Sequence, residues 1–207
     1  MIPIESIIPF VIASALLSIA PGPDNIFVLT QSSLYGKKSG VLITLGLCTG
    51  LIVHTAVVAF GVAVIFQTSS IAFIVLKAVG AGYLLYLAWQ AFSASAENLQ
   101  GKKSTLLSNT ALYRRGIIMN ITNPKVSIFF LAFLPQFASV DKGALAPQIF
   151  LLGTLFIGIA LVIFSLIAIL AGSLGDRLNS SPKAQLYLNR TAGIVLAALA
   201  VKLAMSA

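Results

Sequence analysis

The sequence predicts an all-α integral membrane protein with six transmembrane helices, and three observations support this prediction. First, 58% of the 207 residues are hydrophobic, 9% are charged and the mean hydropathy is +1.02, whereas soluble domains carry about 25% charged residues. Second, the apolar residues form blocks close to the roughly 20 residues that a helix needs to cross a bilayer. Third, basic residues are alternately abundant and scarce from one connection to the next.

A hydropathy window of about 19 residues separates the apolar blocks from one another. In chain order, the six predicted spans are Ile7–Ser33, Val41–Phe66, Ile71–Phe92, Gly116–Phe137, Pro147–Leu174 and Leu186–Met205. Residues 1–207 are therefore expected to form a single membrane domain. Its first three-helix half covers 1–95, a cytoplasmic connection covers 96–115, and its second half covers 116–207.

The basic residues of the connections predict how the chain is oriented. Nine lie in the first, third and fifth connections, or at their ends, and one lies in the fourth. The nine are Lys37, Lys38, Lys102, Lys103, Arg114, Arg115, Arg177, Lys183 and Arg190, and the single one is Lys142. Because Lys and Arg stay on the cytoplasmic side, both termini are expected to face outward. The net charge of +8 is then an orientation signal with attraction to anionic lipid, and a nucleic-acid partner is not expected.

The first predicted span is interrupted near its centre by the motif PGPD at 21–24. As one straight helix this span would measure about 40 Å, whereas the hydrocarbon core is about 30 Å thick. Pro21 and Pro23 each remove a backbone donor and crowd the preceding turn, and Gly22 adds flexibility between them. We expect two half-helices that meet near the midplane, with Asp24 capping the second.

Asp24 gives this break a functional interpretation, because it is the one acidic residue expected inside a span. A carboxylate at that depth costs about 3 kcal/mol. Irregular backbone persists in a membrane only where protein buries it or water reaches it, so the break is expected to line a cavity. The alternative is a proline kink that Asp24 caps and that has no further role.

The fourth predicted span carries a second break at Asn123, Pro124 and Lys125, about one third of the way along it. Three spans separate the starts of the two broken blocks, so the blocks cross the bilayer in opposite directions. Pro23 and Pro124 are 101 residues apart, which is about half the chain. A three-plus-three inverted repeat with paired broken helices is the arrangement in which transporters place their sites near the midplane.

Five motifs spread along the chain carry a family resemblance. They are PGPD at 21–24, LKAVGAGYLLYLAW at 76–89, NPK at 123–125, FLPQF at 133–137 and LNRTAGIVLAALAVKL at 188–203. Together they resemble the LysE/RhtB superfamily of amino-acid exporters, the LysE-type translocators. The resemblance implies a multi-pass protein of the bacterial cytoplasmic (inner) membrane that exports amino acids as a secondary transporter by proton antiport. It is nearest to the neutral-amino-acid branch, whose substrates are threonine, homoserine, leucine or cysteine-like compounds. The alternatives are export of basic amino acids or of a divalent metal such as cadmium.

A free amino acid needs acceptors for its ammonium and donors for its carboxylate. Asp24 and the carbonyls before Pro21 offer acceptors. The amides that open the second half-helix at Asn25 offer donors, because a helix N-terminus favours a carboxylate. The amides near Asn123 and the side chain of Lys125 offer further donors. We expect the ammonium near Asp24 and the carboxylate near Asn123 and Lys125. The alternative is a direct ion pair between Asp24 and Lys125 that gates the cavity or only satisfies both charges.

Proton coupling requires a group that changes its protonation state during the cycle. His54, inside the second span, is a candidate because histidine titrates near neutral pH; the alternative is a histidine that only bonds to a neighbouring helix. Thr49, Lys77 and Gln136 are secondary candidates within other parts of the spans. No cofactor or resident metal is expected, since one Cys and one His make a poor metal site.

Other classes of function lack their sequence signatures. No GxxxxGK[ST] phosphate loop is present, and no nucleophile–base set is expected within the spans, so the chain is not expected to be an enzyme. A membrane assembly protein without transport activity remains the distant alternative. Gly46 and Gly50 have the GxxxG spacing, which permits close helix approach and leaves a homo-oligomer open.

Overall fold

The computed structural model describes residues 2, 4–62, 70–94, 107–179 and 182–205, and the regular structure in these segments is helical. The α-helices are α1 (Ile4–Ile19), α2 (Pro23–Tyr35), α3 (Lys37–Val57), α5 (Ser70–Ser93), α6 (Asn109–Thr122), α7 (Pro124–Ile128), α8 (Leu145–Asn179) and α9 (Pro182–Met205). Four short π- or 3-10-helical segments accompany them: η1 (Val58–Val62), η2 (Phe129–Phe133), η3 (Leu134–Phe137) and η4 (Val140–Lys142). The predicted span end at 63–66 and residues 96–106 of the predicted connection lie outside the described residues.

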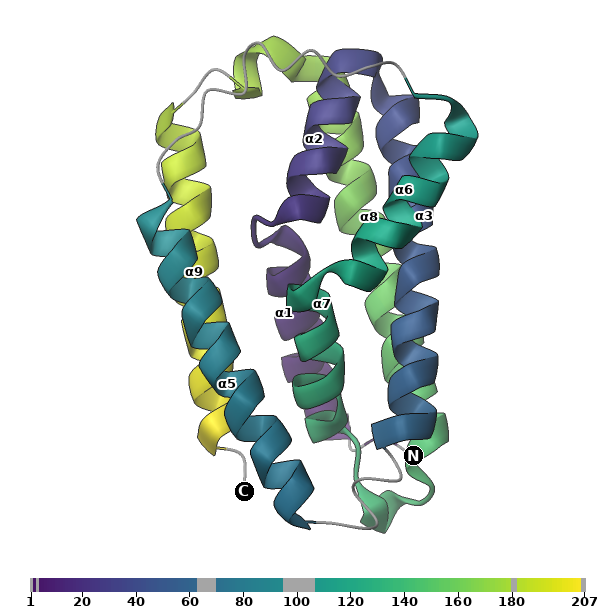
Figure 1. Cartoon of the computed structure of the whole chain (residues 1–207), viewed down its shortest axis with the longest axis vertical. Coiled ribbons are helices and arrows are strands. Elements are labelled where there is room, and N and C mark those ends of the chain that lie inside the picture. Colours follow the sequence, from purple (N-terminus) through teal and green to yellow (C-terminus); the bar gives the residue numbers. More distant parts are fainter. Residues whose placement is uncertain (1, 3, 63–69, 95–106, 180–181, 206–207) are drawn as a thin grey trace.

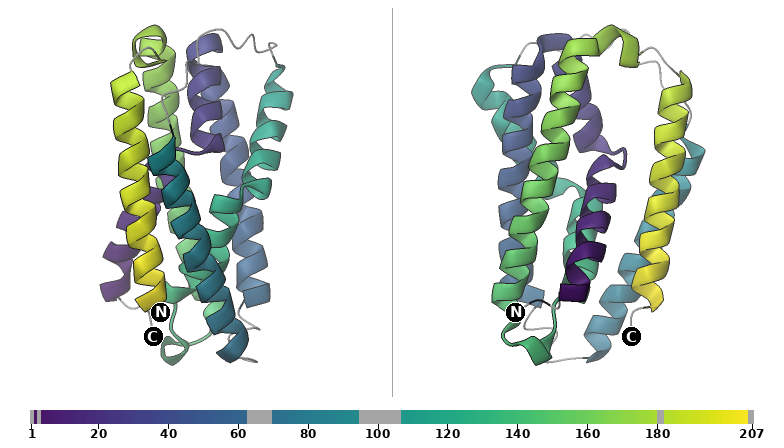
Figure 2. Two further views of the ribbon diagram at one scale, coloured as in Figure 1. Left: turned by 60° about the vertical axis from the view of Figure 1, so that its left-hand side comes forward. Right: turned by 180° about the vertical axis from the view of Figure 1, so that it is seen from behind.

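The helices lie side by side along one long axis and alternate in direction (Figure 1). The α1–α2 pair runs one way, α3 returns, and the later elements continue this alternation to α9. The start of α1 and the end of α9 consequently lie at the same end of the bundle (Figures 1 and 2). The α5 and α9 helices pack along each other on one flank, and α3 packs against α6 and α8 on another. An even number of crossings places the two ends of a chain on the same side in this way.

Three helical stretches are long and apolar enough to cross a membrane, namely Lys37–Gly61, Ile74–Ser93 and Leu145–Ser173. Two more qualify as bent pairs, Ser6–Ile19 with Pro23–Tyr35 and Asn109–Thr122 with Pro124–Phe137. The bends measure 56° and 51°, so the breaks predicted in the first and fourth spans are confirmed. By length and composition, the described residues thus provide three to five spans, and α9 is not among these candidates.

The helix before the second break is longer than the sequence predicts. It begins at Asn109 rather than at Gly116, and the Ser108 side chain caps it by accepting from the Ala111 amide at 3.2 Å. The helix thus extends beyond the predicted start of the span and includes the basic pair at 114–115, which the sequence analysis assigned to the connection. Both side chains are exposed on the helix surface, where long basic side chains keep their charge in a polar environment. The break therefore lies near the middle of the bent pair.

Glycines bring α3 and α6 into close contact. A Cβ atom on Gly46 would collide with the carbonyl oxygen of Tyr113 and lie 3.1 Å from the Cα of Gly116. A Cβ atom on Gly50 would lie 2.7 Å from Oδ1 of Asn120. Small residues let helix backbones approach in this manner, so the predicted role of the GxxxG spacing is confirmed within the chain. The contact holds Asn120 against α3.

Phenylalanine rings fill the half of the bundle that contains α1 and the segments after the second break. The rings of Phe10, Phe129, Phe130, Phe133, Phe137 and Phe156 contact one another with centroid separations from 5.0 to 6.1 Å. All six side chains are buried. They form a packed apolar core directly beside the two breaks.

Candidate functional site

The first break lies between α1 and α2. The α1 helix ends at Ile19, because Pro21 has no backbone N–H with which to continue the ladder. Gly22 is extended, and Pro23 is the first residue of α2, a position that suits its fixed backbone angle. The last carbonyls of α1 are therefore available to donors from other parts of the chain.

The second break lies between α6 and α7, and Asn123 forms it. The Asn123 side chain accepts a hydrogen bond from the backbone amide of Lys125 at 3.0 Å and so caps α7. Pro124 is the first residue of α7, which repeats the placement of Pro23 at the first break. At both breaks, proline is thus the first residue of the second half-helix.

The side chain of Lys125 connects the two breaks. Its ammonium donates to the carbonyl oxygens of Ala20 at 2.8 Å and of Leu17 at 3.3 Å. The side chain is only 6% exposed, and the helix dipole favours a cation at the end of α1. Among the described residues, no direct ion pair joins Lys125 to Asp24, because the ammonium binds backbone carbonyls instead. Gly22 provides the necessary space, since a Cβ there would lie 3.0 Å from Nζ.

Asp24 lies across the same junction and is 2% exposed. The expectation that it caps α2 is wrong, because Gly22 occupies the capping position and Asp24 is the second residue of the helix. Its Oδ2 instead accepts a hydrogen bond from Nδ2 of Asn120 on α6, at 3.3 Å. Each break therefore contributes a side chain that bonds to the other side of the junction.

His54 and Asn25 lie next to this cluster. Nε2 of His54 lies 3.1 Å from the backbone oxygen of Asn120, and its ring packs 5.6 Å from the Phe130 ring, centroid to centroid. Nδ2 of Asn25 donates to the carbonyl oxygen of Ser18 on α1 at 2.7 Å. His54 consequently supports the helix that presents Asn120, and Asn25 helps to satisfy the carbonyls at the end of α1.

Several buried polar atoms of this cluster have no hydrogen-bond partner within the part of the chain that the structure describes. They are Oδ1 of Asp24, Oδ1 of Asn25, Oδ1 of Asn120 and Nδ2 of Asn123. Buried polar atoms in proteins are nearly always satisfied, and leaving one unpaired typically costs about 1–3 kcal/mol. Three unsatisfied acceptors and one unsatisfied donor at one junction are a chemical set that suits a small polar ligand.

Asn120 is the residue that the sequence interpretation missed. It lies one turn before the second break. The sequence signal that could have identified it is an amide side chain within an apolar run, close to the NPK motif. The secondary candidates lie outside the cluster. Thr49 bonds to the hydroxyl of Tyr113 at 2.8 Å, Lys77 lies on α5, and Gln136 lines a cavity of about 170 Å³ near Lys202.

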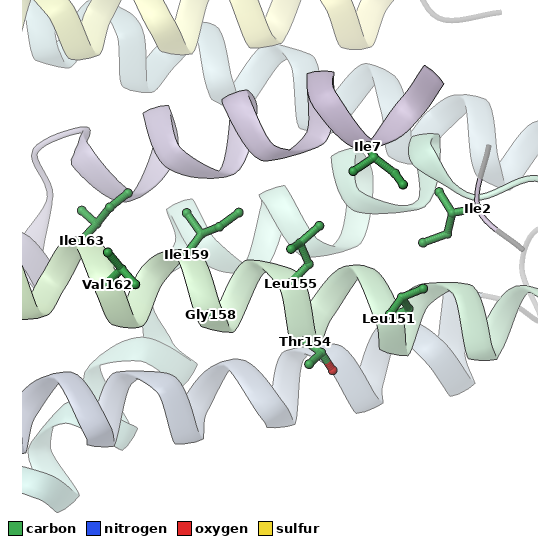
Figure 3. Close-up of a pocket in the computed structure, with 9 residues that line it drawn as sticks. All are labelled: Ile2, Ile7, Leu151, Thr154, Leu155, Gly158, Ile159, Val162 and Ile163. Carbon is green, nitrogen blue, oxygen red and sulfur yellow. The ribbon is translucent and has the colours of Figure 1, made fainter. Parts of the chain in front are cut away.

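A larger, open groove of about 740 Å³ lies between α1 and α8, and the polar residues of the cluster do not line it (Figure 3). Its lining residues are Ile2, Ile7, Leu151, Thr154, Leu155, Gly158, Ile159, Val162 and Ile163. This surface is almost wholly apolar and offers no charged group to a zwitterion. The buried polar atoms described above belong to the junction of the breaks and are not among these lining residues.

Comparison with known proteins gives the family. Residues 15–207, which include both breaks, match the family model described as LysE type translocator. The chain belongs to the LysE type translocator family. This translocator is 33% identical over 184 residues to a homoserine/homoserine lactone efflux protein of Salmonella typhimurium, covering 89% of this chain and 88% of that protein. No solved structure matches it.

Other relatives of this LysE-type translocator come from different bacteria. The uncharacterized membrane protein YrhP of Bacillus subtilis is 28% identical over 211 residues, covering 98% of this chain and 100% of that protein. An uncharacterized membrane protein of Vibrio cholerae is 31% identical over 185 residues, covering 89% of each chain. The similarity thus extends over nearly the whole translocator, including the two halves that supply Asp24 and Lys125.

Proposed function

We propose that this chain is a secondary transporter that exports small neutral amino acids, such as homoserine or threonine, from the bacterial cytoplasm across the inner membrane in exchange for protons. The observation that carries the proposal is the meeting of Asp24 and Lys125, from two separate helix breaks, in one buried polar cluster. The efflux relatives at 33% identity support this class of substrate.

The membrane arrangement is part of this proposal. We take the α1–α2 pair, α3, α5, the α6–η3 segments, α8 and α9 as six spans in a three-plus-three inverted repeat. The alternating helix directions and the shared end of α1 and α9 support it (Figure 1). The basic residues of the odd-numbered connections would place that shared end on the outer side.

The substrate is held by complementary groups at the two breaks. Its ammonium would lie near Asp24, whose Oδ1 is buried and has no hydrogen-bond partner among the residues described. Its carboxylate would lie near the second break, at Nδ2 of Asn123, which faces the Asp24 carboxylate without a hydrogen bond in the described residues. A neutral side chain would adjoin the apolar core around Phe130, which is fully buried beside His54. An amino acid would in this way satisfy atoms that the protein alone leaves unpaired.

The test is exchange of radiolabelled amino acids by the purified protein in liposomes. Liposomes loaded with unlabelled homoserine should take up labelled homoserine, and an Asp24→Asn variant should lose most of this uptake. Asp141→Asn is the matched control, because Asp141 is exposed in the segment between η3 and α8. Equal exchange by Asp24→Asn and wild-type protein would contradict the role of the carboxylate.

A substrate panel in the same liposomes tests the class of substrate. We expect competition by unlabelled homoserine and threonine, and weaker competition by lysine, because the cluster already contains one buried cation in Lys125. Preferential transport of lysine would replace the neutral-amino-acid proposal by the basic-amino-acid one. Protection of cells against cadmium without amino-acid exchange would instead indicate a metal exporter.

A further inference from the structure

We infer that the carbonyl groups of Leu17 and Ala20, together with Asp24, form a site for a primary ammonium group that the substrate and Lys125 occupy in turn. In the structure Lys125 fills it, with Nζ bonded to the two carbonyl oxygens at 3.3 and 2.8 Å. The α-ammonium of an amino acid has the same three N–H donors as a lysine ammonium. This site rests on the proposed export function and specifies how protons are coupled to it.

The junction is built so that Lys125 can reach the carbonyls. Pro21 interrupts the ladder of α1 and leaves its last carbonyls open. Gly22 lacks the Cβ atom that would lie 3.0 Å from Nζ and 3.3 Å from Cε of the lysine. The capping bond from Asn123 to the Lys125 amide fixes the start of α7. The position of the ammonium therefore follows from both breaks together.

The same site contains hydrogen-bond acceptors that Lys125 does not use. Within the described residues, Oδ1 of Asp24 and Oδ1 of Asn25 are buried without a hydrogen-bond partner, and Nδ2 of Asn25 bonds to the Ser18 carbonyl, next to that of Leu17. A tethered ammonium reaches two carbonyls, whereas a freely oriented substrate ammonium could also bond to Asp24. The substrate would gain a charge-assisted hydrogen bond, which is among the stronger kinds, and would thereby displace Lys125.

Competition between Lys125 and the substrate ammonium for one site couples amino-acid export to proton entry. When a substrate ammonium enters from the cytoplasm, the Lys125 ammonium leaves the carbonyls and releases one proton to the cytoplasmic water as it becomes a neutral amine. After the amino acid leaves on the outer side, the Lys125 amine takes one proton from the outer solution and refills the site. One proton thus enters for each amino acid exported. Lysine suits this role because, unlike arginine, it can lose its proton inside a protein.

The charged and titratable groups around Lys125 are consistent with this assignment. Asp24 on α2 lies across the same junction, where it accepts from Asn120, and supplies the counter-charge. His54 on α3 faces the cluster through the backbone of Asn120. The α5 helix, which packs beside α7, brings Lys77 and Tyr83 to a partly buried flank. Lys125 bonds to the carbonyl oxygens of Leu17 and Ala20 at the first break.

The experiment uses the full-length protein in liposomes with labelled homoserine and two measurements. One is exchange with equal pH on both sides, and the other is accumulation driven by an acidic lumen. In Lys125→Gln, exchange should persist with a half-saturating concentration about tenfold lower, because the competing state is removed, and accumulation should be lost. In Lys125→Arg, both should be lost, because the guanidinium keeps its proton and continues to occupy the carbonyls.

A pair of glycine variants provides the matched control. Gly22→Ala should weaken the bonds of Lys125 and shift both measurements towards those of Lys125→Gln. Gly82→Ala on α5, where a Cβ would meet nothing within 4 Å, should match the wild type. Accumulation by Lys125→Gln, or better exchange by Lys125→Arg than by Lys125→Gln, would overturn the shared site. A wild-type protein that exchanges no neutral amino acid would instead remove the export function, and the ammonium site with it.

Discussion

The ammonium of Lys125 lies 2.8 Å from the carbonyl oxygen of Ala20, although 105 positions separate the two residues in the sequence. The acceptor belongs to the first half of the chain and the donor to the second. Neither half completes the polar junction alone, because the Leu17 and Ala20 carbonyls accept from Lys125 and Asp24 accepts from Asn120. This dependence makes the junction sensitive to small changes in either half, which the following variants exploit.

Replacement of Asn120 by alanine should impair transport. The change removes the amide that donates to Asp24 at 3.3 Å, and a buried carboxylate that loses its donor costs about 1–3 kcal/mol. We expect loss of homoserine exchange and a lower unfolding temperature in detergent. Asn109→Ala, at the exposed start of α6, is the control. Exchange at the wild-type rate in Asn120→Ala would show that Asp24 does not need this partner.

Gly46→Ala should destabilise the α3–α6 contact. The added Cβ would collide with the Tyr113 carbonyl oxygen, and overpacking of this kind costs about 1–3 kcal/mol. Thermal unfolding of the detergent-solubilised protein measures the effect. Gly158→Ala, where a Cβ meets nothing within 4 Å, should unfold at the wild-type temperature. A wild-type unfolding temperature for Gly46→Ala would mean that the two helices are less closely packed than described.

His54→Gln should retain exchange with the pH dependence of the wild type. A glutamine side chain can still bond to the backbone oxygen of Asn120, which His54 Nε2 approaches to 3.1 Å, and the coupling proton is assigned to Lys125. His54→Leu should reduce exchange, because it removes this bond. The measurement is homoserine exchange between pH 6 and pH 8. A changed pH profile in His54→Gln would favour the proton-shuttle hypothesis.

Thiol labelling of intact cells should establish the orientation. In a Cys48→Ala background, which removes the buried native thiol, Lys38→Cys and Asp141→Cys place single thiols at exposed positions near opposite ends of the bundle. A membrane-impermeant maleimide should label Asp141→Cys in intact cells, and Lys38→Cys only after permeabilisation, because basic connections stay in the cytoplasm. The reverse labelling pattern would invert the proposed topology.

The positions of the two breaks could be predicted because their cause is local. Pro21, Pro23 and Pro124 remove backbone donors wherever they lie in a helix, and the observed bends follow at those positions. The start of α6 could not be placed in the same way. Exposed basic side chains at 114–115 are compatible with either a helix or a connection. The hydrogen bond from the Ala111 amide to the Ser108 side chain caps the helix and fixes its start.

The functions of individual side chains at the breaks depended on partners far away in the sequence. Asp24 was expected to cap its own helix but accepts a hydrogen bond from Asn120, 96 residues later. Asn120 was missed because an amide within an apolar run is informative only when its neighbours in space are known. Lys125 was a candidate because it follows the second break in the sequence, whereas its carbonyl partners required the structure.

The sequence by itself determined the membrane class, the two helix breaks and the polar residues next to them. These properties arise from hydropathy, from the missing N–H of proline and from the high cost of a charge in lipid. Only the tertiary structure decided which groups satisfy one another across the junction. Hydrogen bonds between the halves depend on how α1, α3 and α6 pack, and the glycine contacts that set this packing act between residues remote in the chain.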